Sequence, residues 1–247
     1  MCLTPIWCAK RLISHIPTQT RCCNCPFRVD SGNTVRLPDT SLLLAMNVYY
    51  SPTPGLQGDG SSVVLFHSQD GLQWQFRANI AVAENFPWSG EGPNEATISL
   101  LSGGKVLMCV FRVDAGDGGR RDKPYMKTFS SDWGVTWSPA QNMSAGIGTA
   151  KPRLLLMDPV DGPLMLVGGR PGNKVWVNPD GDGGDEWHEY DMPPPPSEEG
   201  GWDGGAVSVG RSTTSYNGIA KLTPKTGAVS YDLNHRVYAV YFSIQKK

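Results

Sequence analysis

The sequence has little of what a membrane-spanning, nucleic-acid-binding or helical protein needs. No uninterrupted apolar run approaches the roughly 20 residues that a membrane-spanning helix requires. Lysine and arginine number 22 against 23 aspartates and glutamates, and no basic stripe follows the chain, so nucleic-acid binding has no electrostatic basis. No stretch keeps a long 3.6-residue apolar period, whereas glycine (29) and proline (20) are abundant. The composition therefore predicts an all-β domain of short strands and many turns.

Cysteine is almost absent beyond residue 25. Five of the six cysteines lie in the first 25 residues, and the sixth, Cys109, lies in an apolar strand pattern where a small buried hydrophobic residue is expected. Cys22 and Cys25 have the spacing of half a zinc site, but Cys2 and Cys8 have the wrong spacing for the other half. Disulfides among them stay open, and neither a metal nor another cofactor is predicted.

The N-terminal segment carries no repeating pattern. Residues 1–20 lack the sustained apolar core of a secretory signal, so no signal peptide is predicted and the compartment stays open. The alternation of strand-like and turn-like segments begins near Asn33. We therefore expect a poorly structured, cysteine-rich leader over residues 1–30 and one β domain over residues 31–247, a length that allows a sizeable core.

One turn motif organises the rest of the chain. Residues 130–137 read S-x-D-x-G-x-T-W. The side chains of Ser130 and Asp132 can hydrogen-bond the backbone of their own turn. Gly134 accepts a positive φ without a Cβ penalty, and Trp137 covers the turn with a large apolar face. The motif therefore predicts a tight β-hairpin.

Two further copies of this turn indicate a repeat. One contains Ser68, Asp70 and Trp74 and is one residue shorter; the other is degenerate, with Asp180 and two extra residues before Trp187. Copies at intervals of roughly 40–60 residues are typical of propeller blades. Strand patterns around them define four units, with strands at 34–37, 42–46, 63–67 and 74–80, at 96–101, 106–112 and 125–129, at 153–157, 164–167, 174–177 and 187–190, and at 216–222 and 237–242.

These turns resemble the Asp-boxes (BNR repeats) of the sialidase, or neuraminidase, superfamily, and the resemblance extends over about residues 33–243. It implies an all-β β-propeller of the sialidase type, with the boxes as structural elements on the outer rim, away from the chemistry. The family's propeller has six blades, whereas about four blade-like units are visible here. We therefore expect either a fragment or truncated product of such a ring, or units that close differently.

The resemblance also marks candidate site residues. Glu95 lies in an N-E sequence before one strand, and Arg112 ends the next strand 17 residues later. Arg170 lies in the corresponding place of the third unit, with Arg153 as the alternative, and Tyr216 lies in a segment like that of the family's nucleophile. The implied roles are nucleophile for Tyr216, base for Glu95, acid for Asp59, and binding of the substrate carboxylate for Arg112, Arg170 and Arg28. The segment around Arg28 lacks the family's proline.

The residue types fit the chemistry of sialic acid, which carries a carboxylate on its anomeric carbon. A carboxylate nucleophile would meet like-charge repulsion there, and tyrosine avoids it. Because an unperturbed tyrosine has a pKa near 10, it needs a base such as Glu95. Arginine binds a carboxylate through two parallel hydrogen bonds, which lysine does not offer. The function implied is therefore retaining hydrolysis of terminal sialic acid or a related acidic sugar through a tyrosyl intermediate.

Other interpretations stay open at this point. Arg112 can also cap a strand, Tyr216 can also be a core aromatic residue, and Asp59, between two glycines, can also hold a turn. An incomplete arginine triad would give a non-catalytic, lectin-like or structural propeller. In addition, residues 178–189 match several positions of a calcium-binding loop, at Asn178, Asp182 and Glu189 among others, but a strand pattern precedes them where such a loop needs a helix.

Overall fold

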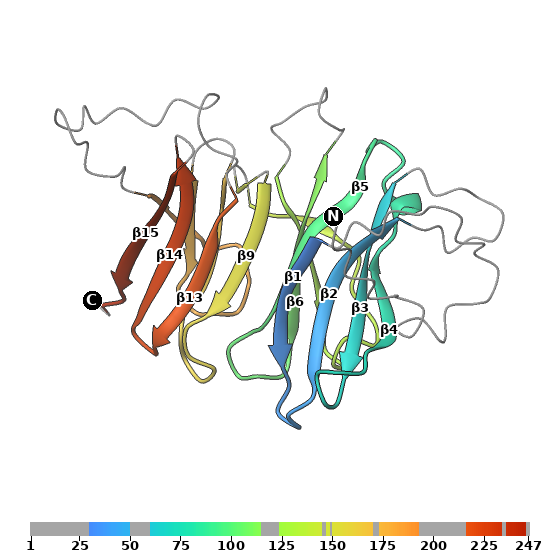
Figure 1. The fold of residues 1–247 in the computed structure, drawn as a ribbon, viewed down its shortest axis with the longest axis horizontal. Coiled ribbons are helices and arrows are strands. Elements are labelled where there is room, and N and C mark those ends of the chain that lie inside the picture. The colour runs from blue at the N-terminus through green and yellow to red at the C-terminus, as the bar shows by residue number, and fades with distance from the viewer. Residues whose placement is uncertain are drawn as a thin grey trace, which may run out of the picture.

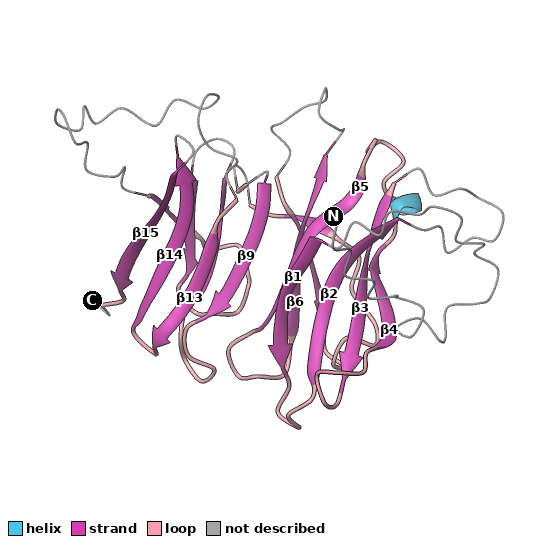
Figure 2. Cartoon of the chain, viewed as in Figure 1, coloured by secondary structure: helices cyan, strands magenta, loops and turns pink. Residues whose placement is uncertain are grey.

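The computed structural model describes residues 30–49, 60–114, 124–144, 147–148, 150–169, 173–192, 216–233 and 236–245. Within these ranges the chain consists of strands and turns, with one short 3-10 turn, η2 (Ala83–Asn85) (Figure 2). In the same ranges there is no helix of the length and apolarity that a membrane span requires. The all-β prediction is confirmed, and the predicted leader lies outside the described residues except for Asp30.

In the part of the chain that the structure describes, the strands form four separate antiparallel sheets, and in each sheet neighbours in sequence are neighbours in space. The first sheet contains β1 (Asp30–Arg36), β2 (Leu42–Tyr49), β3 (Ser61–Ser68) and β4 (Gln75–Ala81). The second contains β5 (Gly92–Leu100), β6 (Leu107–Asp114), β7 (Met126–Ser130) and β8 (Gln141–Asn142). The third contains β9 (Ala150–Leu156), β10 (Leu164–Gly169), β11 (Asn173–Asn178) and β12 (His188–Asp191). The fourth contains β13 (Gly218–Thr223), β14 (Thr226–Leu233) and β15 (Arg236–Ser243).

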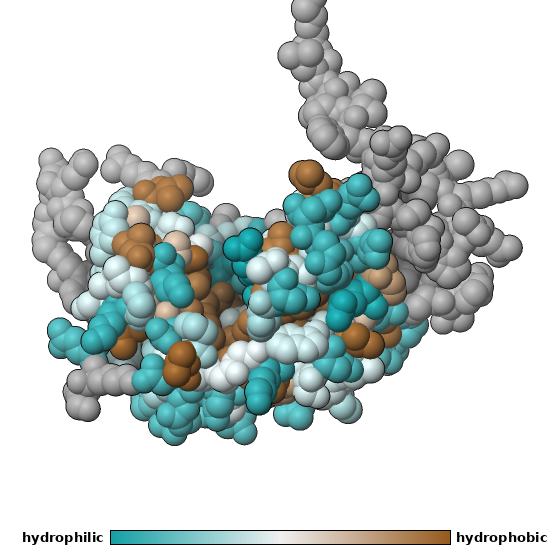
Figure 3. Space-filling model, turned by 90° about the horizontal axis from the view of Figure 1, so that it is seen from below, coloured by the Kyte–Doolittle hydropathy of each residue, from teal (hydrophilic) through white to brown (hydrophobic). Residues whose placement is uncertain are grey.

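The four sheets are arranged as the blades of a β-propeller. Their first strands lie side by side, because β1 packs against β5, β5 against β9 and β9 against β13 (Figure 1). Side chains tie these strands together: the Thr97 hydroxyl donates to Asn33 Oδ1 at 2.7 Å and accepts the Leu154 N–H at 3.1 Å. Seen from below, the surface is hollowed between the two ends of the arrangement (Figure 3). The four predicted units are therefore four blades around a hollow.

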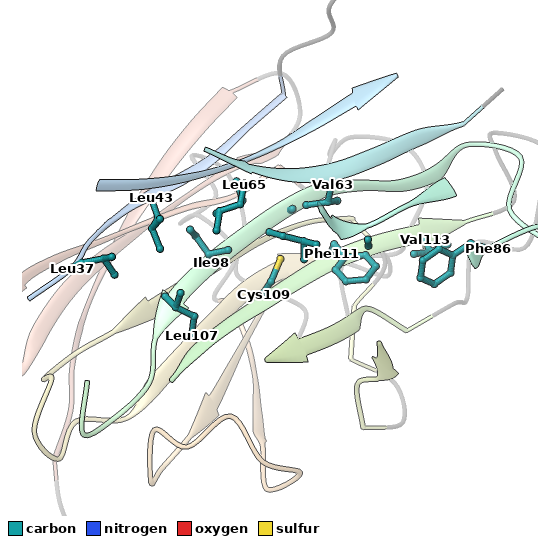
Figure 4. Close-up of a cluster of buried hydrophobic side chains, with 14 residues drawn as sticks. Leu37, Leu43, Val63, Leu65, Phe86, Ile98, Leu107, Cys109, Phe111 and Val113 are labelled. Carbon is teal, nitrogen blue, oxygen red and sulfur yellow. The ribbon is translucent and has the colours of Figure 1, made fainter. Parts of the chain in front are cut away.

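Each pair of adjacent blades encloses its own hydrophobic cluster. Along β6, Leu107, Cys109 and Phe111 point into the cluster shared with the first blade (Figure 4), whereas Met108 and Val110 point into the cluster shared with the third. This is the two-residue period of a strand that is buried on both faces. A third cluster joins the third and fourth blades. Cys109 is fully buried, as the sequence predicts, and its thiol is free.

The predicted boxes connect the third strand of a blade to the segment that follows it. In the second blade, Asp132 Oδ1 accepts the N–H groups of Val135 and Thr136 at 3.1 and 2.9 Å, and the hydroxyls of Ser130 and Thr136 donate to the same carboxylate. Gly134 has a φ of 83°, as expected for the residue that turns the chain. The turn thus satisfies its own backbone.

The first and third boxes repeat this construction with local changes. Asp70 Oδ1 accepts two turn amides at 2.8 Å each, and the Trp74 indole donates to the Gly71 carbonyl. The Trp187 indole likewise donates to a glycine carbonyl three residues earlier. In this third box the carboxylate that accepts a turn amide is Asp182, whereas the sequence pattern placed that carboxylate at Asp180. Because two residues are inserted before Trp187, the accepting carboxylate lies two positions later in the sequence.

Candidate active site

Glu95 and Arg112 are brought together by the hairpin of β5 and β6. Asn94 pairs with Arg112 across the two strands, and an irregularity in β5 follows at once. Within it Glu95 has a φ of 48°, a left-handed conformation that is uncommon for a residue with a side chain. Its side chain is buried, and Arg112 Nη1 lies 3.3 Å from Glu95 Oε2. The hairpin therefore supplies a buried, ion-paired carboxylate.

Tyr216 reaches this carboxylate from the fourth blade. It lies two residues before β13, is 41% exposed, and its hydroxyl donates a short hydrogen bond to Glu95 Oε1. The next residue, Asn217, is buried and donates from its side-chain amide to the Gly168 carbonyl at 2.8 Å, which fixes this segment against the third blade. The structure thus brings together three of the residues that the sequence marked: Glu95, Arg112 and Tyr216.

Lys151, in the third blade, completes the surroundings of the pair, and the sequence did not mark it. Its backbone N–H donates to Glu95 Oε2 at 2.9 Å. Its ammonium lies over the Tyr216 ring, 4.7 Å from the centroid. Like Glu95, it has a positive φ, 23°. The following Pro152 favours an extended conformation for the residue before it, so nothing in the sequence indicates this positive φ.

A buried tyrosine holds the segment that carries Lys151. The Tyr125 ring is fully buried, and its hydroxyl donates a short hydrogen bond to the Ala150 carbonyl. The Tyr125 hydroxyl oxygen also accepts the Ala150 N–H at 3.2 Å. Gly148 and Gly168 lie so close to this ring and hydroxyl that neither has room for a Cβ. Burial raises the pKa of Tyr125 far above its ordinary value, and the charge of Glu95 raises it further, so this phenol stays neutral.

A second carboxylate flanks Arg112. Glu91 Oε2 lies 3.9 Å from Arg112 Nη2 and accepts a hydrogen bond from the Asn94 side chain at 3.3 Å. The guanidinium therefore lies between Glu91 and Glu95. An arginine held by two carboxylates keeps its orientation fixed.

The remaining predicted residues divide into two groups. Arg28, Asp59 and Arg170 lie outside the described residues. The box residues lie at the opposite end of the blades from Glu95. In the second blade Ser130 pairs with Leu107, at the far end of β6 from Arg112. The boxes and the Glu95 site are thus separated by the length of a strand, as the resemblance implies.

The loop that matched a calcium-binding pattern binds the side-chain ammonium of Lys127. The Lys127 ammonium lies 2.7 Å from Asp185 Oδ1 and within 3.3 Å of the Gly183 and Gly184 carbonyl oxygens. Lys127 is buried, so these oxygens neutralise and solvate a charge that comes from the neighbouring blade. Among the described residues, no group of three or more histidine, cysteine, aspartate or glutamate side chains could hold a metal ion.

Solved structures similar to this chain include several glycosidases. A Hadza microbial sialidase superposes with a TM-score of 0.59 at 14% identity, over 87% of this chain and 37% of that one. The intramolecular trans-sialidase from Ruminococcus gnavus gives 0.53 at 15%, over 86% and 43%. The RS223 beta-xylosidase gives 0.60 at 12%, over 88% and 75%.

At these identities the likeness concerns the fold. The chain has the β-propeller fold of sialidases and related glycoside hydrolases, which confirms the prediction from the repeated turns. It spans less than half the length of both sialidase structures. No protein-family model matches the sequence, and no curated protein matches it.

Proposed function

We propose that this chain acts as a retaining glycosidase of the sialidase type, which releases a terminal acidic sugar through a covalent intermediate on Tyr216. The observation that carries the proposal is the hydrogen bond from the Tyr216 hydroxyl to the buried Glu95 carboxylate. A phenol is a weak nucleophile at neutral pH unless an adjacent base takes its proton. Glu95 is that base in the proposal, and the 41% exposure of Tyr216 lets a substrate reach it.

In the proposed reaction the Tyr216 oxygen bonds to the anomeric carbon while the glycosidic bond breaks. The phenolic proton passes to Glu95, and an acid gives its proton to the leaving oxygen. Asp59 keeps this acid role from the sequence prediction. Water then attacks the same carbon and loses a proton to the acid residue, while the Tyr216 oxygen leaves and recovers its proton from Glu95. Two displacements at one carbon retain its configuration.

The substrate class follows from Arg112. Its guanidinium, held between Glu91 and Glu95, is a planar donor suited to a carboxylate beside the reacting carbon. Arg28 and Arg170 are proposed as the further arms of the arginine triad. Tyrosine as nucleophile also favours a substrate whose anomeric centre carries negative charge, because a carboxylate nucleophile would be repelled there. Of the structures similar to the chain, one is named as a sialidase and another as a trans-sialidase, which supports sialic acid as the first substrate to test.

The second candidate function is a lectin-like propeller that binds the acidic sugar without cleaving it. It is favoured by the segment around Arg28, which lacks the family's proline, because an incomplete arginine triad would bind an acidic sugar without positioning it for cleavage.

One experiment separates the candidates. The purified chain is incubated with a fluorogenic sialoside, and binding of free sialic acid is measured in parallel by calorimetry. Turnover, with the first-formed sugar in the substrate's anomeric configuration by proton NMR, supports the glycosidase. Binding without turnover supports the lectin-like function. Neither turnover nor binding would leave only a structural role for the propeller and end both proposals.

A further inference from the structure

We propose that Lys151 is a positioning residue for the Glu95–Tyr216 pair, whose ammonium stabilises the negative charge that develops on Tyr216 as it loses its proton. This inference rests on the proposed function and adds to it a residue that acts through the nucleophile. Lys151 contacts both members of the pair, Glu95 with its backbone and Tyr216 with its side chain.

The backbone contact fixes the base. The Lys151 N–H donates to Glu95 Oε2 at 2.9 Å, while the other oxygen, Oε1, accepts the Tyr216 hydroxyl. The carboxylate is thus held so that one oxygen is occupied by an amide and the other faces the phenol. Lys151 keeps a φ of 23° in this arrangement. A strained residue persists only where its surroundings hold it, and here the buried Tyr125 does so through Ala150.

The side-chain contact concerns the nucleophile. A cation within about 6 Å of a ring centroid is attracted by the negative face of the ring. At 4.7 Å the Lys151 ammonium meets this condition at the Tyr216 ring. As the phenolic proton moves to Glu95, negative charge grows on the oxygen and spreads into the ring, so the attraction grows with it. An interaction that is stronger in the transition state than in the ground state accelerates the chemical step.

A different role for the same ammonium gives a different kinetic result. If Lys151 bound the substrate carboxylate, its contribution would be equal in the bound substrate and in the transition state. Removing such uniform binding raises KM and leaves kcat unchanged. Removing an interaction made only in the transition state lowers kcat and kcat/KM by the same factor. The two roles are therefore separable by steady-state kinetics.

The test compares three variants with the wild type on one fluorogenic sialoside. Lys151→Met removes the charge and keeps the length of the side chain, and Lys151→Arg restores a cation. Lys105→Met is the matched control, since Lys105 is exposed in the turn between β5 and β6. We expect Lys151→Met to lower kcat and kcat/KM equally, by about 2- to 30-fold, with KM unchanged. Lys151→Arg should recover most of the loss, and Lys105→Met should match the wild type.

Each result decides the proposal. A Lys151→Met protein with wild-type kcat, or with a raised KM and unchanged kcat, overturns the inference and leaves the proposed function intact. A loss that follows a lowered thermal midpoint and that Lys151→Arg does not recover shows a structural role and overturns it as well. If the wild type has no turnover, the proposed function fails, and the role of Lys151 fails with it.

Discussion

The Tyr216 hydroxyl and the Glu95 carboxylate form a hydrogen bond between residues 121 positions apart in sequence. Glu95 belongs to the second blade, and Tyr216 precedes the first strand of the fourth. The third blade contributes the Lys151 N–H to the same carboxylate. Three blades therefore converge on one buried side chain, and their packing sets the geometry of the candidate site.

The first prediction concerns this pair. Tyr216→Phe removes the phenolic oxygen and keeps the ring, so turnover should fall to background while the thermal midpoint stays within about 2 °C of the wild type. Glu95→Gln should damage turnover as well, and the double variant should be little worse than either single one, because residues that act as a unit are not additive. Fluorogenic turnover and calorimetry measure both properties.

The control for this experiment is Tyr241→Phe. Tyr241 is 76% exposed on β15, so loss of its hydroxyl should change neither activity nor stability. A Tyr216→Phe protein that retains wild-type turnover would remove Tyr216 from the mechanism.

A second prediction is that the box in the second blade stabilises the fold and does not take part in catalysis. Asp132 accepts hydrogen bonds from the Val135 and Thr136 amides and from the hydroxyls of Ser130 and Thr136. Asp132→Ala leaves those donors without their acceptor and should lower the thermal midpoint by about 2–4 °C. Activity per folded molecule should be preserved. A folded variant with a normal midpoint and no turnover would contradict this.

A third prediction follows from the acidity of the same carboxyl. Hydrogen bonds from the Thr136 side chain and backbone, and then from Ser130, lower the pKa of Asp132 from its ordinary value to about 2. A pKa that is lower in the folded state contributes stability above the unfolded pKa, near 4, and this contribution is lost as the pH falls toward about 2. The midpoint difference between the wild type and Asp132→Asn should therefore be present at pH 7 and vanish near pH 2. A difference that grows on acidification would contradict it.

The fourth prediction is that a chelator leaves the thermal midpoint unchanged. The Gly183 and Gly184 carbonyls and the Asp185 carboxylate, which lie in the loop of the calcium-like pattern, bind the Lys127 ammonium. A ligand that binds only the native state stabilises it, so removal of a bound calcium ion would lower the midpoint. Scanning calorimetry with and without EDTA measures this. A clear drop in EDTA would restore the calcium-loop interpretation.

A fifth prediction concerns the packing around Tyr125. Gly148 has a φ of 68° and lies against the Tyr125 ring, whereas Gly103 has a φ of 82° with open space around it. Gly103→Ala should cost roughly 1–2 kcal/mol of unfolding free energy, the cost of the left-handed conformation alone. Gly148→Ala adds a clash with a buried ring and should cost roughly 2–5 kcal/mol. Urea unfolding of the two variants tests the difference, and equal costs would show that the ring can move aside.

Much of the fold follows from local sequence patterns. The alternation of apolar residues along β6, the turn residues of the boxes and the burial of Cys109 all follow from the two-residue strand period and from side chains that satisfy their own turns. The pairing of Glu95 with Arg112 is also local, because one hairpin joins them 17 residues apart. The sequence by itself therefore determined the four blades and, within the candidate site, the pairing of Glu95 with Arg112.

The positions of Tyr216 and Lys151 beside Glu95 depended on the tertiary structure. The approach of Tyr216 to Glu95 depends on how four sheets pack, and that packing is set by three hydrophobic clusters, not by any local pattern. The residue type of Lys151 does not indicate its contact with Glu95, because that contact uses a backbone N–H, which every residue except proline carries. The choice of Asp182 over Asp180 in the third box was likewise decided by the turn's three-dimensional path. Chemistry that lies in side-chain types is readable from sequence, whereas chemistry that lies in backbone groups and in long-range packing appears only when the chain is folded.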